Sequence, residues 1–181
     1  MRTPYTSLPL TRGRVLDAAL AVAEREGLER LSMRLVAREL DVSPMALYRH
    51  VTNKDDLLDA LVARLLGELR LPEESLPWDQ RLRALAVELR ALAHRHTGLF
   101  ALLLRRRAVG AGATRAREVA LRALRDSGLD PAAAARRERL LSTLIMGFAV
   151  SEIAGRFASV EDVDAEFEEA LSLLAGLVVA R

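Results

Sequence analysis

The sequence predicts an all-α protein, and three observations support this fold class. Alanine, leucine and arginine dominate its 181 residues. The alternation of apolar and polar residues that is typical of strands is absent, whereas apolar residues recur at spacings of three and four. Proline and glycine fall between the segments that have this helical spacing. The length is sufficient for one or two small domains with a good core.

The first elements are two helices within residues 11–40 and a short third helix after them. Ser32 is suited to cap the second helix, whose apolar face contains Val36, Ala37 and Leu40. The pattern breaks at residues 41–42. Ser43 then offers a second N-cap, and Pro44 takes the first helical position, where its missing N–H is tolerated.

The short third helix has one buried and one outward side. Leu47 and Val51 are expected to bury it, which leaves four residues pointing outward: Met45, Ala46, Arg49 and His50. A two-turn helix with a free outer face, braced by another helix across a tight turn, has the shape that enters a DNA major groove. The segment therefore predicts binding to double-stranded operator DNA.

The same segment carries a family resemblance. The run VSPMALYRHVTNKDDLL, residues 42–58, resembles the DNA-binding signature of tetracycline-repressor (TetR) family regulators, and residues 11–40 resemble the first two helices of that family. The resemblance covers residues 11–68. It implies a helix-turn-helix DNA-binding domain at 1–55, a linking fourth helix at 53–69, and a helical bundle for ligand binding and dimerisation at 56–181.

Three residues of the third helix are expected to touch base edges. Arg49 can form a two-pronged contact with guanine O6 and N7, while Met45 and Ala46 can contact a thymine methyl group. Arg34 matches a family position that touches a base or the DNA backbone.

Four further residues suit phosphate oxygens: Ser43, Tyr48, His50 and Lys54. The ring of Tyr48 can equally pack in the small core of the motif. Lys54 is the only lysine, and it follows Asn53, the expected N-cap of the fourth helix. Because a cation is disfavoured at the positive end of a helix, its position points to an incoming phosphate.

Charge supports this interpretation only slightly. Residues 1–54 hold nine Lys or Arg against six Asp or Glu, whereas the remainder holds eighteen against nineteen. A basic N-terminal part is what an electrostatic footprint on phosphate requires. Arg2, Arg12 and Arg14 lie where arms reach the backbone or minor groove, although solvated terminal charge explains them equally well.

The remaining chain is expected to be helical with loops between its segments. Leucines and valines from 57 to 69 continue the fourth helix. A loop is expected at Gly110–Gly112, and it is not a dinucleotide fingerprint because no strand precedes it. The expected later helices are Trp78–Arg95, Leu99–Arg106, Thr114–Ser127, Pro131–Phe157 and Asp162–Ala180.

The last two helices have apolar stripes wider than one intramolecular contact needs. Two such helices from each subunit can form a four-helix bundle about a two-fold axis, which in the resembling family is the usual dimer interface. The alternative is that both stripes are the core of a monomer. The expected interface residues are Leu141, Leu144, Ile145, Phe148, Phe167, Leu171, Leu174 and Val178.

By resemblance, the middle helices enclose an apolar cavity whose small-molecule effector shifts the protein between two states. Glu152 can orient a cationic or hydroxylated ligand, or it can be solvated near its helix end. For each candidate, ordinary core packing is the alternative. The candidates are Trp78, His94, Phe100, Leu103, Met146, Phe148 and Glu152.

Other function classes find little support. There is no cysteine, no HExxH, CxxC or GxSxG motif, and His94 and His96 point in different directions on a helix. We expect no enzyme, no metal, no cofactor, no signal peptide or membrane helix, and a cytoplasmic location. The predicted function is a ligand-responsive homodimeric repressor. The alternatives are an architectural DNA-binding protein without effector, an activator, and a helical adaptor that no longer binds DNA.

Overall fold

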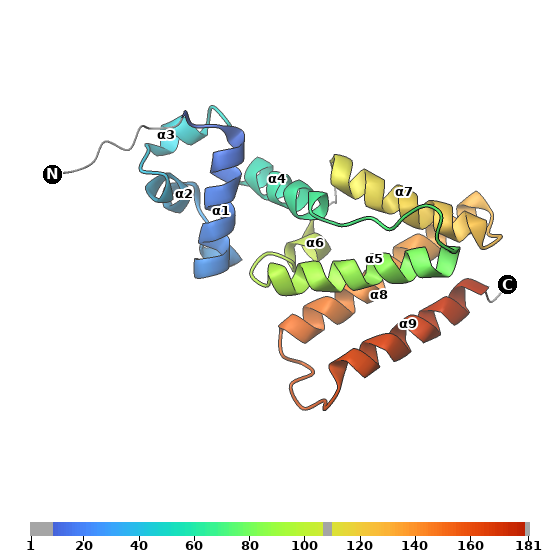
Figure 1. Cartoon of the computed structure of the whole chain (residues 1–181). Coiled ribbons are helices and arrows are strands. Elements are labelled where there is room, and N and C mark those ends of the chain that lie inside the picture. Colours follow the sequence, from blue (N-terminus) through green and yellow to red (C-terminus); the bar gives the residue numbers. More distant parts are fainter. Residues whose placement is uncertain (1–8, 107–109, 180–181) are drawn as a thin grey trace. The chain divides into compact units, whose positions relative to one another are not determined.

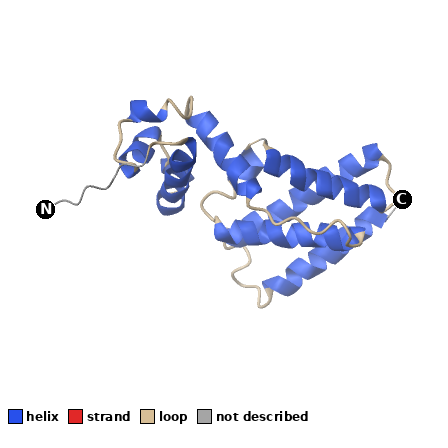
Figure 2. Cartoon of the chain, turned by 45° about the horizontal axis from the view of Figure 1, so that its top comes forward, coloured by secondary structure: helices blue, strands red, loops and turns tan. Residues whose placement is uncertain are grey.

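The prediction of an all-α protein is confirmed. A computed structural model describes residues 9–106 and 110–179, and within these ranges every regular element is a helix (Figure 2). None of the helices in the described ranges is long and apolar enough to cross a membrane. Contacts divide the chain into an N-terminal unit, residues 1–61, and a C-terminal unit, residues 62–181. This division falls inside the fourth helix, whereas the sequence analysis placed a domain boundary at residue 55.

The described part of the N-terminal unit contains three complete α-helices, a 3₁₀ turn and the start of a fourth α-helix (Figure 1). They are α1 (Arg12–Glu26), the 3₁₀ turn η1 (Leu28–Arg30), α2 (Met33–Glu39), α3 (Pro44–Leu47) and the first turns of α4 (Lys54–Gly67). Helix α2 contacts both α1 and α3. The core is formed by the apolar faces of these helices: Val15, Ala19, Val22, Leu31, Val36, Leu47, Val51, Leu57 and Leu61.

Local side-chain chemistry starts these helices where the sequence predicts. The hydroxyl of Thr11 accepts the Arg14 N–H, and that of Ser32 accepts the Leu35 N–H at 3.3 Å. Ser43 precedes α3 and Pro44 opens it, although Ser43 makes no side-chain capping bond. Between α2 and α3, Asp41 adopts φ +54°, a left-handed conformation that aspartate tolerates better than most residues. The tight turn thereby brings the Val42 N–H to the Ala37 carbonyl at 3.0 Å.

The C-terminal unit is a bundle of helices around α5. It comprises the end of α4, α5 (Trp78–Arg95), α6 (Leu102–Arg105), α7 (Ala111–Asp126), α8 (Pro131–Ile153) and α9 (Val163–Val179). Helix α5 packs against α7, α8 and α9, and α6 against α8 (Figure 1). Two clusters of buried side chains form its core: Leu124, Ala134, Leu141 and Val178, and Ala86, Ile145 and Phe167.

Three expected boundaries are wrong in this unit. Helix α8 ends at Ile153 and not at Phe157, because residues 154–159 form turns. Helix α7 begins at Ala111, so Gly112 lies in a helix and not in a loop. Gly112 is buried because α7 crosses the end of α4 there, and a Cβ on Gly112 would lie 2.6 Å from the Gly67 nitrogen. Glycine is therefore required by the close approach of two backbones, not by a turn. The expected helix over 99–106 is shorter, because residues before Leu102 form turns.

Candidate DNA-binding surface and ligand cavity

The short helix α3 and the turn after it have the predicted inner and outer sides. Leu47 and Val51 are 0% and 1% exposed, which anchors the segment on the core of the N-terminal unit. On the outer side, Met45 is 75% and Tyr48 47% exposed. Arg49 is also exposed. The outer side therefore presents apolar, aromatic and cationic side chains to the solvent.

The other predicted DNA contacts surround this helix in sequence and belong to the same unit. Ser43, Arg34 and Lys54 are exposed, whereas Ala46 and His50 are half-buried. Tyr48 is nearly half exposed, which is compatible with both roles expected for it, a phosphate contact and packing within the motif. All eight predicted DNA-contact residues are at least partly exposed, so each can contact DNA.

The start of α4 is held by a group of polar side chains, of which only Asn53 was expected there, as the N-cap of this helix. Asn53 Oδ1 accepts the Asp56 N–H at 2.8 Å, and Asp56 Oδ2 accepts the Thr52 N–H at 2.8 Å. Arg12 then donates from Nη2 to Asp56 Oδ1 at 2.8 Å and from Nη1 to the His50 carbonyl. These bonds join the first turn of α1 to the turn after α3 and to the first turn of α4.

This arrangement corrects the expected role of Arg12. Its guanidinium binds Asp56 and the backbone of His50, so Arg12 positions the turn after α3 and is not a free arm. Arg14 donates to the Pro9 carbonyl at 3.3 Å. Arg2 lies outside the described residues. Only the contacts with Asp56, which lies 44 residues from Arg12, reveal this role.

Acid should loosen the N-terminal unit through Asp56. Hydrogen bonds from Arg12 and then from the Thr52 backbone lower the pKa of Asp56 from 3.8 to about 2. A carboxyl group whose pKa is lower in the folded state stabilises folding above its unfolded pKa, and this contribution is lost as the pH falls towards 2. Asp56→Asn should therefore destabilise the unit at neutral pH by about 1–2 kcal/mol, allowing for the half-exposed Arg12.

Amide hydrogen exchange in α1 and α4 measures this effect without a tryptophan probe. The difference between wild type and Asp56→Asn should be constant at neutral pH and should shrink below pH 3.8. Equal protection of both proteins at neutral pH would contradict the assigned role of Asp56.

The C-terminal unit contains a cavity of about 720 Å³ between α5, α7, α8 and α9. Its lining is mainly leucine, alanine, isoleucine and valine, with Trp78 at the start of α5. Leu66 at the end of α4 and Leu69 after it also belong to the lining. The volume is within the range of pockets that hold drug-sized ligands.

The structure brings only two of the seven predicted lining residues into this cavity, Trp78 and Met146. Phe100 and Leu103 are buried, 0% and 6% exposed, and are not in its lining. Phe148 stacks obliquely with the rings of Phe157 and Phe167, at centroid distances of 4.8 and 5.1 Å. Core packing therefore explains Phe100, Leu103 and Phe148, and this is the alternative that the sequence left open.

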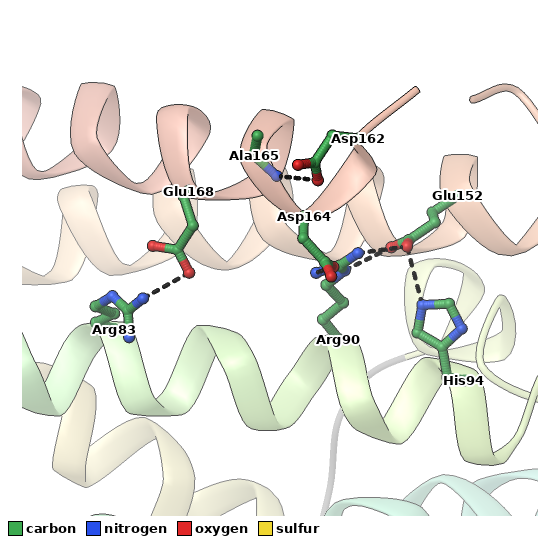
Figure 3. A network of polar contacts seen from close by, with 8 residues as sticks. All are labelled: Arg83, Arg90, His94, Glu152, Asp162, Asp164, Ala165 and Glu168. Atoms are coloured by element: carbon green, nitrogen blue, oxygen red, sulfur yellow. Dashed lines mark hydrogen bonds and ion pairs between the residues drawn. The ribbon is translucent and has the colours of Figure 1, made fainter. Parts of the chain in front are cut away.

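Glu152 and His94 line a second, more open cavity of about 600 Å³ beside α9. Here Arg90 donates two hydrogen bonds to Glu152, at 2.7 and 2.6 Å, and pairs with Asp164 at 2.7 Å (Figure 3). His94 Nε2 lies 3.1 Å from Glu152, and the Arg90 guanidinium lies 4.7 Å from the centre of the Phe167 ring. The hydrogen bonds from Arg90 are the main reason why the pKa of Glu152 is lowered. Glu152 is thus neither solvated nor free for a ligand: it ties α8 to α5.

The predicted dimer residues divide between two sides of α8 and α9. Four are buried within the protomer: Leu141, Ile145, Phe167 and Val178. Phe148, Leu171 and Leu174 are half-buried, and Leu144 is exposed. The predicted interface residues therefore come from two faces of the helices, because adjacent leucines of α8 point in different directions. Among the side chains of α8 and α9 that the structure describes, the large apolar ones that are exposed are Leu140, Leu144 and Leu173.

The sequence-based set contained none of the charged residues that line the main cavity, and two of these form a pair across it. Glu138 on α8 and Arg117 on α7 both line it, and Arg117 Nε lies 3.3 Å from Glu138 Oε2. The sequence does contain a signal for Glu138, since it interrupts the apolar stripe of α8.

Among residues 9–106 and 110–179, no group of three or more His, Asp or Glu side chains could hold a metal ion.

Comparison with known proteins gives matches over both units. Residues 15–61 match the family model "Bacterial regulatory proteins, tetR family", and residues 82–174 match "Tetracyclin repressor-like, C-terminal domain". The transcriptional repressor DrrR1 of Streptomyces coeruleorubidus is 39% identical over 140 residues, 76% of this chain and 49% of that protein. The chain spans 49–63% of the length of the curated relatives that it matches over most of its own sequence.

Two solved structures show the same fold. ActR of Streptomyces coelicolor in complex with actinorhodin has a TM-score of 0.85 and 28% identity, covering 95% of this chain and 98% of that one. BioQ with its double-stranded DNA operator has a TM-score of 0.82 and 30% identity, covering 96% of this chain and 100% of that one.

Proposed function

Because this chain belongs to the TetR family of bacterial regulatory proteins, we propose that it is a homodimeric transcriptional repressor that a small molecule releases from a pseudo-palindromic operator. The observation that carries the proposal is the outer face of α3, where Met45, Tyr48 and Arg49 are exposed over the buried Leu47 and Val51. A regulator of this kind acts by binding and not by catalysis, and it works in the cytoplasm, where its operator is.

The names of similar proteins support each part of the proposal. DrrR1 is named as a transcriptional repressor, BioQ was solved with its operator, and ActR was solved with actinorhodin. In this chain, the cavity of about 720 Å³ offers a place for an effector. Leu66 and Leu69 line it, and α4 continues from there into the N-terminal unit. An effector that contacts these residues differently in two states can shift the equilibrium between them.

Dimerisation is proposed through the exposed side of α8 and α9. Leu140, Leu144 and Leu173 are 41%, 44% and 67% exposed, and contact with a second copy would remove their apolar surface from water. Two copies joined there would present two α3 helices to successive major grooves, as an inverted-repeat operator requires.

Binding of the purified chain to a randomised DNA pool at two salt concentrations, followed by sequencing of the bound DNA, tests the proposal. We expect enrichment of an inverted repeat. Binding without enrichment, lost at the higher salt, would favour an architectural protein instead. Absence of binding at both salt concentrations would overturn the assignment of a DNA-binding surface.

Arg49 is expected to read a base. Replacing it with alanine should relax discrimination at one base pair of each half-site, at a cost of about 1–3 kcal/mol. Titration of the selected operator and of its single-base variants measures this. A uniform loss of affinity over all variants would instead make Arg49 a phosphate contact.

Lys54 is expected to contact a phosphate at the start of α4. Lys54→Ala should weaken binding about equally on all sequences and should lower the slope of log affinity against log salt by roughly one unit. Arg64, exposed later on the same helix, provides a matched control, since Arg64→Ala removes the same charge away from the helix start. If both variants change the slope equally, the effect is one of net charge and not of a specific contact.

A further inference from the structure

Glu138 is a carboxylate on the core-facing side of α8. The buried residues of that helix are Ala134, Leu141, Ile145 and Ala149, which form one stripe along it. Glu138 lies in the same stripe, four residues after Ala134 and three before Leu141. Its side chain is only 12% exposed, and it lines the main cavity. A carboxylate at such a position is unfavourable unless a partner compensates for its lost hydration.

The partner that the chain itself provides is weak. Arg117 Nε lies 3.3 Å from Glu138 Oε2, at the long end of hydrogen bonding, and the Arg117 side chain is 53% exposed. A strong pair would have shorter, two-pronged geometry, as Arg90 and Glu152 show in the same unit at 2.6 and 2.7 Å. Glu138 therefore retains capacity to accept a charged donor from inside the cavity.

The net charge of the lining has the same sign as the charge of Glu138. The lining contains four carboxylates, Asp79, Glu118, Glu138 and Glu168, against two guanidinium groups, Arg83 and Arg117. Arg83 pairs with Glu168 and Arg117 with Glu138, so Asp79 and Glu118 remain as excess negative charge. A cation is thus favoured over an anion inside this cavity.

We propose that the cavity binds a cationic amphiphile, an apolar molecule whose protonated amine donates to Glu138. The apolar body would lie among Trp78, Leu121 and Ile145, which belong to the same lining. This inference rests on the proposed function only in naming the cavity as the effector site. It defines which chemical class of effector the site accepts.

Three fluorescent tricyclic probes of similar size test the inference on DNA-free protein at neutral pH. They are 9-aminoacridine, which is a cation, acridine, which is neutral, and anthracene-9-carboxylate, which is an anion. We expect 9-aminoacridine to bind about tenfold or more tightly than acridine, the scale of one charge-assisted hydrogen bond. Equal binding of the two, tighter binding of the anion, or no binding of any probe would overturn the proposal.

Glu138→Gln removes the charge while keeping the shape of the side chain. It should remove the preference for 9-aminoacridine and leave acridine binding unchanged. Glu118→Gln is the matched control, since it removes the same charge from an exposed lining residue of α7. We expect the control to keep the preference to within about threefold. Equal effects of the two variants would mean that general electrostatics, and not Glu138, selects the cation.

Two readouts keep the inference separate from the proposed function. A thermal melt of each variant shows whether it folds, and the ranking of probes on the wild-type protein stands without any variant. Operator binding is measured on the same preparations. Loss of DNA binding by all of them would overturn the repressor assignment and leave the probe ranking as the test of the cavity.

Discussion

Gly112→Ala is expected to destabilise the C-terminal unit by about 2–3 kcal/mol, as overpacking of a close helix crossing does. The added Cβ would lie 2.6 Å from the Gly67 nitrogen and 2.7 Å from the Gly67 Cα and the Leu66 carbonyl carbon. These are backbone atoms of α4, so no side-chain rotation can relieve the clash. The start of α7 has to move away from α4 instead.

Urea denaturation followed by tryptophan fluorescence measures this loss directly. Trp78 is the only tryptophan in the chain and lies in the C-terminal unit, so its signal reports on that unit. Gly67→Ala is the matched control, because nothing lies within 4 Å of a Cβ at Gly67 although this residue belongs to the same crossing. The control should be neutral or stabilising by up to about 1 kcal/mol. Similar losses in both variants would contradict the close approach at Gly112.

The features that could be predicted from sequence are those whose signals are local. The cap at Ser32, the proline at the start of α3 and the inward spacing of Leu47 and Val51 each depend on a few neighbouring residues. The pairing of Arg12 with Asp56 depends on the folded unit, and their separation of 44 residues gives no periodic signal. This is why the exposed side of α3 was predicted, whereas the pairing of Arg12 with Asp56 was not.

Gly112 shows how a local signal can mislead. Gly110 and Gly112 together resemble a loop, and Gly110 does have φ +104° before the helix. Two residues later, glycine serves a different purpose, because α7 has to approach the backbone of α4. Composition alone cannot distinguish a glycine in a turn from a glycine at a helix crossing.

Helix α8 shows the limit of apolar periodicity. Leu140 and Leu144 are exposed, whereas their neighbours Leu141 and Ile145 are buried. Both pairs have helical spacing, so the sequence predicts two apolar sides without saying which of them α5 covers. The predicted dimer residues therefore came from both sides, and only the packing separates them.

Glu138 and Glu152 show the same limit for charge. Both are carboxylates on α8, but Glu138 lies between Arg137 and Arg139 whereas Glu152 lies among apolar residues, and the sequence favoured Glu152 as a ligand contact. The deciding fact is Arg90, which lies 62 residues before Glu152 and satisfies both of its oxygens. Glu138 has only the long contact with Arg117, which is why the cavity, and not the α5–α9 side, is the better candidate for recognising a cation.

Glu152→Ala is expected to destabilise the C-terminal unit by about 3 kcal/mol, the scale for removing one partner of a largely buried ion pair. The side chains of Arg90 and Glu152 are 15% and 11% exposed, so Arg90 would keep its charge in a poorly hydrated place. Asp164 remains as a partner, but it is 85% exposed and compensates only in part. Urea denaturation followed by Trp78 fluorescence gives the difference.

The matched control is a more exposed ion pair of the same helix α5, this time with α9. Arg83 on α5 pairs with Glu168 on α9 at 2.5 Å, but their side chains are 55% and 47% exposed (Figure 3). Arg83→Ala should therefore change stability by less than about 1 kcal/mol, as exposed pairs do. If Arg83→Ala and Glu152→Ala destabilise equally, burial is not what makes the Arg90 network important.

The pH dependence gives the sign of the contribution. Hydrogen bonds from Arg90 lower the pKa of Glu152 below 4.5, so the carboxylate stabilises folding above that pH and loses this effect as the pH falls. The difference between wild type and Glu152→Ala should therefore be constant near neutral pH and narrow in acid. The double variant Arg90→Leu with Glu152→Leu should recover most of the loss, because it leaves no buried charge without a partner. A double variant as unstable as Glu152→Ala would instead mean that the two side chains are needed for their shape, since removing the stranded charge would then bring no gain.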